Sequence, residues 1–147
     1  MRSALLVLVG LVAAGCSSPV DPKLVEGTWH QDFSAIPGNS FQMTLSSNGS
    51  EISGTGFGCA EAGPCANSTI VGNVDSRGIH LTITSATIGQ TPGQLSESRF
   101  DGHLFLSDLL IGKLRAVGPG DEIGLVSDVR YSKGGVYPTV EKQSRTY

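Results

Sequence analysis

Three histidines, His30, His80 and His103, carry the side chains that most often bind transition metals in proteins. The alternation of apolar and polar residues around them places all three on the polar faces of separate strands. None stands in the H-x-H or H-x-x-x-H spacing that gathers ligands on one element. We therefore interpret them as solvated side chains, and the sequence predicts neither a metal site nor a cofactor.

Acidic residues and serines, the other common catalytic groups, also lack a catalytic arrangement. Asp101 and Asp108 flank an expected turn, and Asp121 and Glu122 open an expected strand, where charged residues are usual. The chain has no G-x-S-x-G motif, and its glycine-rich segment 54–58 lacks the lysine of a phosphate-binding loop. We expect this protein not to be an enzyme.

The amino-terminal segment has the pattern of a secretory signal peptide. A basic start at Arg2 precedes the apolar run 4–12, and small residues then lead directly to Cys16. The apolar run is shorter than the roughly 20 residues that a membrane-spanning helix needs. The segment therefore predicts export.

The residues before Cys16 make this signal more specific. The stretch 12–16, Val-Ala-Ala-Gly-Cys, resembles the lipobox of bacterial lipoproteins, although Ala13 stands where that family more often has leucine. The resemblance implies cleavage after residues 1–15, a thioether-linked diacylglycerol on Cys16, and a new amino terminus that carries a fatty acid such as palmitate. Several acyl chains make a stable membrane anchor, where a single chain binds only marginally.

The resemblance also bears on location. Ser17 follows Cys16 at the position where an aspartate could have signalled retention in the inner membrane. In a two-membrane bacterium this favours the cell outer membrane. The alternative is an ordinary secreted protein in which Cys16 is incidental. Residues 16–23 contain two prolines and are expected to form an extended, lipidated tether.

With Cys16 assigned to lipid, Cys59 and Cys65 are the two cysteines left to pair. They enclose residues 60–64, which end in a Gly-Pro turn signal. In an oxidising compartment the two thiols are expected to form a disulfide. A redox-active or metal-binding pair is the alternative, but the C-x-x-C spacing and a neighbouring histidine are both missing.

Residues 24–130 show apolar residues with a period of two, interrupted by turn signals such as Asn48-Gly49. The pattern predicts strands and no helix, with a polar C-terminal tail at 131–147 that is at most an edge strand. Val129 and the apolar residues before it in the last strand, Ile123 and Leu125, are expected to face inward. The eight expected strands cover residues 24–33, 40–47, 51–59, 67–74, 79–85, 99–106, 108–116 and 121–130.

Eight short, evenly spaced strands predict an all-β fold, a small antiparallel up-and-down β-barrel, with a β-sandwich as the alternative. The loop 86–96 is the longest expected connection. Glycines recur in the middle of strands, where we expect them to mark bends or bulges at barrel corners: Gly54, Gly56, Gly72, Gly102, Gly112 and Gly124.

The segment Gly27-Thr28-Trp29 resembles the G-x-W pattern of the calycin superfamily, the lipocalins and avidins. The resemblance implies that Trp29 packs across the closed end of an eight-stranded barrel. Lipocalins also place a last-strand arginine over this tryptophan. Arg130 is the only candidate for that position, although alternation turns it outward. Avidins line their biotin site with several tryptophans, and this chain has one, so biotin binding does not transfer.

The chain has 147 residues and a formal net charge of −3, so it lacks the positive charge of a nucleic-acid-binding protein. We interpret it as a membrane-anchored lipoprotein of the bacterial envelope that binds a small apolar ligand without catalysis. The alternative is a structural lipoprotein with a filled barrel that binds an envelope protein partner through the loop 86–96 and the tail. A third class, an unrecognised hydrolase, has no supporting motif. The residues expected to contact the ligand are Trp29, Phe33, Phe41, Met43 and Phe100.

Overall fold

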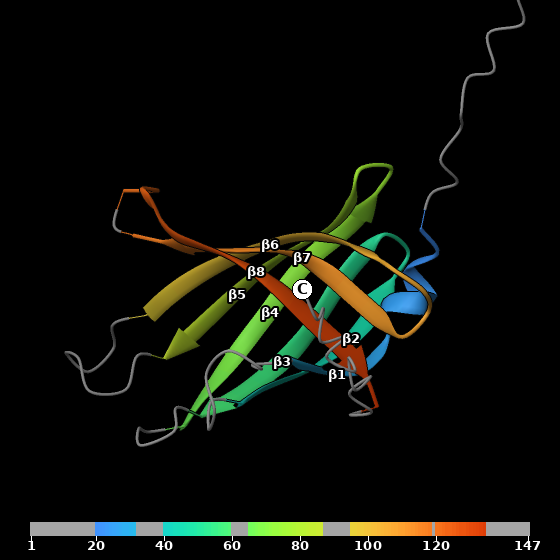
Figure 1. Ribbon diagram of the computed structural model, residues 1–147, viewed down its shortest axis with the longest axis horizontal. Coiled ribbons are helices and arrows are strands. Elements are labelled where there is room, and N and C mark those ends of the chain that lie inside the picture. Colours follow the sequence, from blue (N-terminus) through green and yellow to red (C-terminus); the bar gives the residue numbers. More distant parts are fainter. Residues whose placement is uncertain (1–19, 32–39, 60–64, 87–94, 119, 135–147) are drawn as a thin grey trace, which may run out of the picture.

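The computed structural model describes residues 20–31, 40–59, 65–86, 95–118 and 120–134. Within these residues eight antiparallel strands form one closed barrel in which each strand pairs with its neighbours in sequence and β8 pairs with β1 (Figure 1). The up-and-down barrel is therefore confirmed. The elements are η1 (Pro22–Val25), β1 (Gly27–Gln31), β2 (Ser40–Asn48), β3 (Glu51–Cys59), β4 (Cys65–Asp75), β5 (Gly78–Ala86), β6 (Leu95–Leu104), β7 (Leu109–Val117) and β8 (Ile123–Lys133).

Several predictions fall on residues outside the described part of the chain. These are the signal peptide 1–15 with the lipidation site Cys16, the aromatic Phe33, most of the loop 86–96, and residues 135–147 of the tail.

The alternation of apolar and polar residues along the strands predicts correctly, over most of the barrel, which side chains face inward. Alternate residues of each strand point inward and bury apolar side chains, and each large aliphatic side chain fully removed from water contributes about 1.5–3 kcal/mol. The buried apolar core consists of Val25, Trp29, Met43, Leu45, Ile52, Ile70, Val74, Ile79, Leu81, Ile83, Phe100, Leu110, Val129 and Tyr131.

Of the six mid-strand glycines, Gly124 lies at a bulge, as expected, in the pairing of β7 with β8. Strand pairing continues without a bulge at the other five, which make room for a large neighbouring side chain. A Cβ atom at Gly56 would lie 2.7 Å from the ring of Phe41, and one at Gly112 would lie 2.6 Å from the ring of Phe100. Leu45 lies in the same way over Gly54. The glycines thus allow large inward side chains to lie flat against the adjacent strand.

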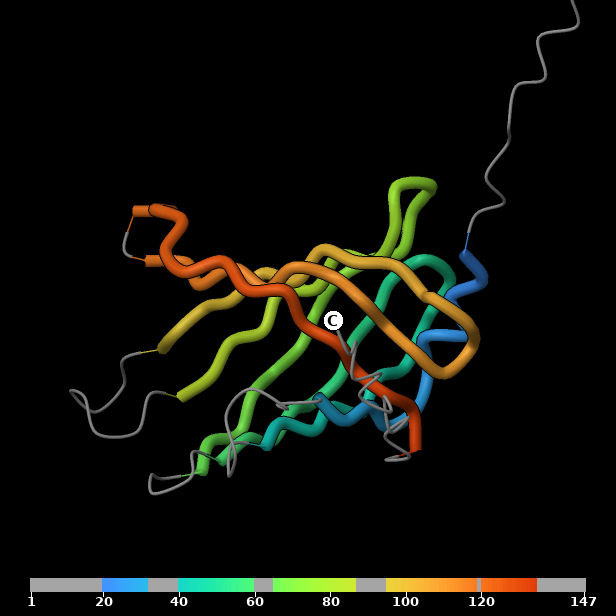
Figure 2. Tube along the Cα trace, viewed as in Figure 1, coloured from blue at the N-terminus to red at the C-terminus, as the bar shows by residue number. Residues whose placement is uncertain are grey.

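One end of the barrel is closed by η1, which corrects two expectations (Figure 2). We expected no helix, and an extended chain through residue 23. Instead Asp21 caps a 3-10 turn by accepting a hydrogen bond from the Lys23 backbone, and Pro22 occupies the first helical position, where its missing N–H is not needed. Val25 in this turn is fully buried.

The last strand is longer than expected, because the tail was predicted to begin at Tyr131. β8 continues to Lys133 and closes the barrel by pairing Tyr131 with Gln31 and Lys133 with Trp29. Arg130 is exposed, as the alternation predicts. The basic side chain over the tryptophan is that of Lys133, whose Nζ lies 5.3 Å from the ring centroid of Trp29.

The other end of β8 also departs from the pattern. Ile123 and Leu125 were expected to face inward, but 65% and 76% of their surfaces are exposed. The pairing of β7 with β8 shifts between Arg115 and Val117, where β8 contributes an extra residue. Residues 123–126 are all exposed, so neither face of β8 packs against the core at and beyond the bulge. The prediction that these two residues face inward was therefore wrong.

Candidate functional site

A hollow of about 300 Å³ lies at the mouth of the barrel, opposite the end that η1 closes. Its walls are residues from seven of the eight strands. Among the described residues that line it, none carries a charge. They are Gln31, Ser40, Phe41, Gly58, Cys59, Ile83, Ser85, Ser98, Leu114 and Tyr131.

Aromatic rings form one side of this hollow. The Tyr131 ring contacts Phe41 edge-on, with 6.4 Å between ring centroids, and contacts Phe100 at 5.6 Å. Both distances are typical of favourable aromatic pairs. Phe100 is almost fully buried beneath Tyr131, whereas Phe41 is only partly buried and reaches the hollow.

The hydroxyl of Tyr131 is the distinctive polar group of the mouth. It is buried and finds no hydrogen-bond partner among the described residues. Burial raises the pKa of Tyr131, so the side chain remains a neutral O–H donor at ordinary pH. A buried donor without an acceptor loses its bonds to water and gains nothing in return. A ligand atom that accepts this hydrogen bond would remove that penalty.

Another polar group of the mouth, the hydroxyl of Ser85, has a partner on the neighbouring strand. The hydroxyls of Ser68 and Ser85 lie 2.7 Å apart and form a hydrogen bond between β4 and β5. Gln31 is buried, with 7% of its surface exposed. The hollow therefore combines apolar walls with few polar groups, as small-molecule sites commonly do.

The predicted ligand-binding residues are distributed along the barrel. Phe41 lines the mouth, whereas Trp29, Met43 and Phe100 are almost fully buried in the core. Phe33 lies outside the described residues.

Three of the large side chains that line the mouth, those of Ile83, Leu114 and Tyr131, were not selected from the sequence as ligand-binding. Ile83 and Leu114 lie on the expected inward faces of their strands, and that alternation was the available signal. Tyr131 was assigned to the tail, and the missing signal was its pairing with Gln31 across the closure of the barrel.

The predicted disulfide between Cys59 and Cys65 is confirmed. The two cysteines face each other in the pairing of β3 with β4, and their Cα atoms are 4.0 Å apart. Cys59 also lines the mouth. The bridge therefore joins two neighbouring strands at the rim of the hollow.

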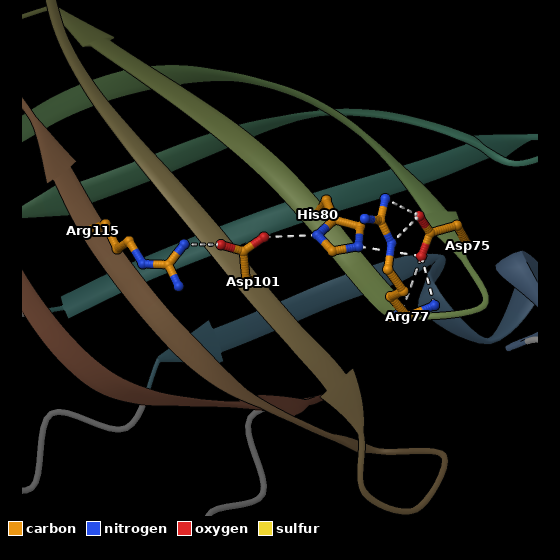
Figure 3. A network of polar contacts seen from close by, with 6 residues as sticks. Asp75, Arg77, His80, Asp101 and Arg115 are labelled. Carbon is orange, nitrogen blue, oxygen red and sulfur yellow. Dashed lines mark hydrogen bonds and ion pairs between the residues drawn. The ribbon is translucent and has the colours of Figure 1, made fainter. Parts of the chain in front are cut away.

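A charged network occupies the outer face of β4, β5, β6 and β7 (Figure 3). His80 Nδ1 lies 2.7 Å from a carboxylate oxygen of Asp101, and His80 Nε2 lies 3.3 Å from one of Asp75. Arg115 pairs with Asp101, and Arg77 pairs with Asp75. Both ring nitrogens of His80 thus face carboxylates.

Hydrogen bonds from the backbone and side chain of Arg77 lower the pKa of Asp75 to about 2. The carboxylate is therefore ionised at neutral pH and ties the β4–β5 turn together. In the part of the chain that the structure describes, no group of three or more His, Cys, Asp or Glu residues is arranged to hold a metal ion. The network joins β4, β5, β6 and β7 across the outer face of the barrel.

A second hollow, of about 600 Å³, lies on the outer face of β2 to β6. A row of threonines crosses this face, since Thr44, Thr55, Thr69 and Thr84 pair directly with one another across successive strands. Phe57 is half exposed beside them. The described lining is uncharged and consists of Gln42, Thr44, Thr55, Gly56, Phe57, Asn67, Ser68, Thr69, Thr84, Ala86 and Leu95.

No known protein family, curated protein or solved structure matches this chain. Among the described residues, none of the helical segments is long and apolar enough to cross a membrane.

Proposed function

We propose that this protein is a lipid-anchored, non-catalytic binding module that holds a small, mostly apolar ligand in the mouth of its barrel. The observation that carries the proposal is the uncharged hollow of about 300 Å³ lined by Tyr131, whose hydroxyl is buried and has no hydrogen-bond partner among the described residues. A volume of roughly 300–1,000 Å³ with apolar walls and a few polar groups is typical of small-molecule sites.

The walls define the chemistry of the ligand. Phe41, Ile83, Leu114 and the Tyr131 ring favour an apolar body, because burying apolar surface is the main source of affinity there. The described lining offers no charge to balance an ionised ligand, and isolated buried charges are strongly unfavourable. The proposed ligand is therefore neutral and has one oxygen that accepts a hydrogen bond from Tyr131.

The anchor rests on the lipobox-like stretch that ends at Cys16. We propose that lipid on this cysteine holds the protein in the bacterial envelope, at the outer membrane where there is one. The calycin resemblance supports the binding role by analogy. Trp29 of its G-x-W segment lies at the closed end, and Lys133 covers the ring from the last strand.

Native mass spectrometry of the mature protein, exported and purified gently, tests the ligand directly. We expect a mass in excess of the chain that organic solvent releases, and a much smaller excess in Tyr131→Phe, which keeps the ring and removes the donor. A melting temperature that stays the same or rises in this variant is the control for folding, because the change removes a buried hydroxyl without a partner. A wild-type protein that carries no excess mass and takes up no neutral apolar probe would contradict the proposal.

The uncharged hollow on the outer face favours one second candidate, an envelope protein that binds a partner there. Its flat row of threonines and the exposed Phe57 resemble a contact surface more than a small-molecule site. In that case the purified protein would carry no small ligand in its barrel. Loss of a protein partner in Thr69→Lys, together with a wild type that carries no ligand, would support this candidate over the first.

A further inference from the structure

The turn between β6 and β7 exposes two large apolar side chains at its tip. Phe105 is 55% exposed and Leu106 is 70% exposed. Neither side chain belongs to the apolar core of the barrel. Turn tips usually carry small or polar residues, since exposed apolar side chains gain nothing from folding. The barrel itself therefore gives no reason for this pair.

Leu106 is also held in an unfavourable backbone conformation. Its φ of 68° lies in the left-handed region, which glycine and asparagine adopt readily and branched, bulky residues rarely adopt. A leucine that is both strained and exposed does not help the chain fold. Residues with such strain tend to occur where the side chain serves a function.

The tip lies beside η1, at the closed end of the barrel (Figures 1 and 2). The backbone N–H of Lys133 donates to Asp108 O at 2.8 Å, and the Nζ of the same lysine donates to Leu24 O at 3.0 Å. One residue thus links the β6–β7 turn to η1. Leu24 is itself 43% exposed. We name Leu24, Phe105 and Leu106 the closed-end patch.

The proposed anchor leaves the barrel at this same end. Val20, the first described residue, packs against the core beside η1. Only Ser17, Ser18 and Pro19 separate it from Cys16. Four residue steps of about 3.5 Å each span at most about 14 Å, so lipid on Cys16 brings the bilayer that close to the closed end.

A second exposed apolar group, at Ile123 and Leu125, lies near the opposite end of the barrel. β8 runs from Ile123 to Lys133, and a strand advances about 3.3 Å per residue, so roughly 30 Å separates this group from the closed end. The short tether reaches the closed-end patch far more readily.

We propose that the closed-end patch inserts into the surface of the membrane that holds the lipid on Cys16. The barrel then stands with its closed end on the bilayer and its mouth toward water. This inference rests on the proposed lipid anchor. Apolar side chains at an interface add to the membrane binding of an acyl anchor, and here they would also fix the orientation.

Tryptophan substitutions at the two ends test the orientation. The full-length protein is lipidated during expression and reconstituted in phosphatidylcholine–phosphatidylglycerol vesicles with brominated acyl chains, which quench nearby tryptophan. Phe105→Trp carries the probe in the patch, and Leu125→Trp is the matched control at the far end. Trp29, fully buried, gives the same background in both. We expect strong quenching of the added emission in Phe105→Trp and little in Leu125→Trp.

A second change separates membrane contact from folding. Adding Leu106→Asn to Phe105→Trp relieves the left-handed strain, so we expect a higher melting temperature together with weaker quenching. Flotation with the vesicles reports the anchor independently. Protein that floats but shows equal quenching at both ends, or none at Trp in position 105, overturns the orientation alone. Protein that does not float overturns the lipid anchor and the orientation with it.

Discussion

At the scale of single residues, the structure explains why the G-x-W segment has glycine at position 27 and tryptophan at position 29. Gly27 has a φ of +118°, and a Cβ atom there would lie 2.8 Å from Cε of Lys133. Trp29 is fully buried and donates from Nε1 to Val25 O at 2.8 Å. The glycine therefore gives the lysine room to cover the tryptophan, which in turn holds η1 in place.

Replacing Trp29 by alanine is expected to lower the free energy of unfolding by about 3–5 kcal/mol, because it removes a large buried side chain and leaves a cavity. Chemical denaturation measures this difference. Leu125→Ala, at an exposed position, is the matched control, and its effect should stay within about 0.5 kcal/mol. A loss below about 1 kcal/mol for Trp29→Ala would mean that the closed end does not depend on this ring.

At the scale of elements, the sequence predicts what depends on local pattern. The alternation of apolar residues locates eight strands, and Asn48-Gly49 locates a hairpin whose glycine has a φ of +60°. The turn η1 is too short for a helical period to appear. The last residues of β8, Tyr131 to Lys133, have polar side chains although they are buried or half-buried, so their polarity hides the strand. The bulge before them depends on pairing with β7.

Glu26 connects η1 to the barrel. Its carboxylate accepts hydrogen bonds from Lys23 Nζ at 2.8 Å, from Ser47 Oγ at 2.7 Å and from the Ser47 backbone at 3.1 Å. The bond from Lys23, followed by those from Ser47, lowers the pKa of Glu26 from 4.5 to about 2. The ionised form is therefore the one that holds the turn on β2.

This shift has a defined sign in the dependence of stability on pH. Since the pKa is lower in the folded protein, the stabilisation is complete above about pH 4.5 and is lost as the pH falls toward 2. The melting temperature of the wild type should fall over that window more steeply than that of Glu26→Gln. Glu51→Gln, which removes an exposed carboxylate at the start of β3, is the control for the loss of one negative charge. Parallel curves for the wild type and Glu26→Gln would contradict the assignment.

At the scale of the whole molecule, the mouth was harder to predict than the barrel. Alternation identifies which side chains face inward, and Phe41, Ile83 and Leu114 satisfy it. It does not give the depth of a residue along the barrel axis, which follows from the stagger of all eight strands. Trp29, Met43 and Phe100 therefore proved deeper than the hollow, and Tyr131 entered it through a pairing that joins the two ends of the chain.

The position of the ligand can be tested by filling the mouth. Ser98 lines the hollow and pairs with Ile83 on β5. A leucine there would occupy part of the volume and bury new apolar surface, so we expect Ser98→Leu to lose the bound mass while its melting temperature stays the same or rises. Ser53→Leu, on the exposed outer face, should retain the bound mass.

Ser98→Leu is informative because we expect it to lose the ligand without losing stability. A variant that is merely misfolded would lose both ligand and stability, whereas a filled site loses the ligand alone. Retention of the ligand by a well-folded Ser98→Leu protein would place the binding site outside the mouth. A Ser98→Leu protein that is more stable but no longer binds the ligand would identify the hollow as the binding site. The wild-type protein would then keep this space open for its ligand and be less stable than a filled barrel, a trade-off that is common where function requires a cavity.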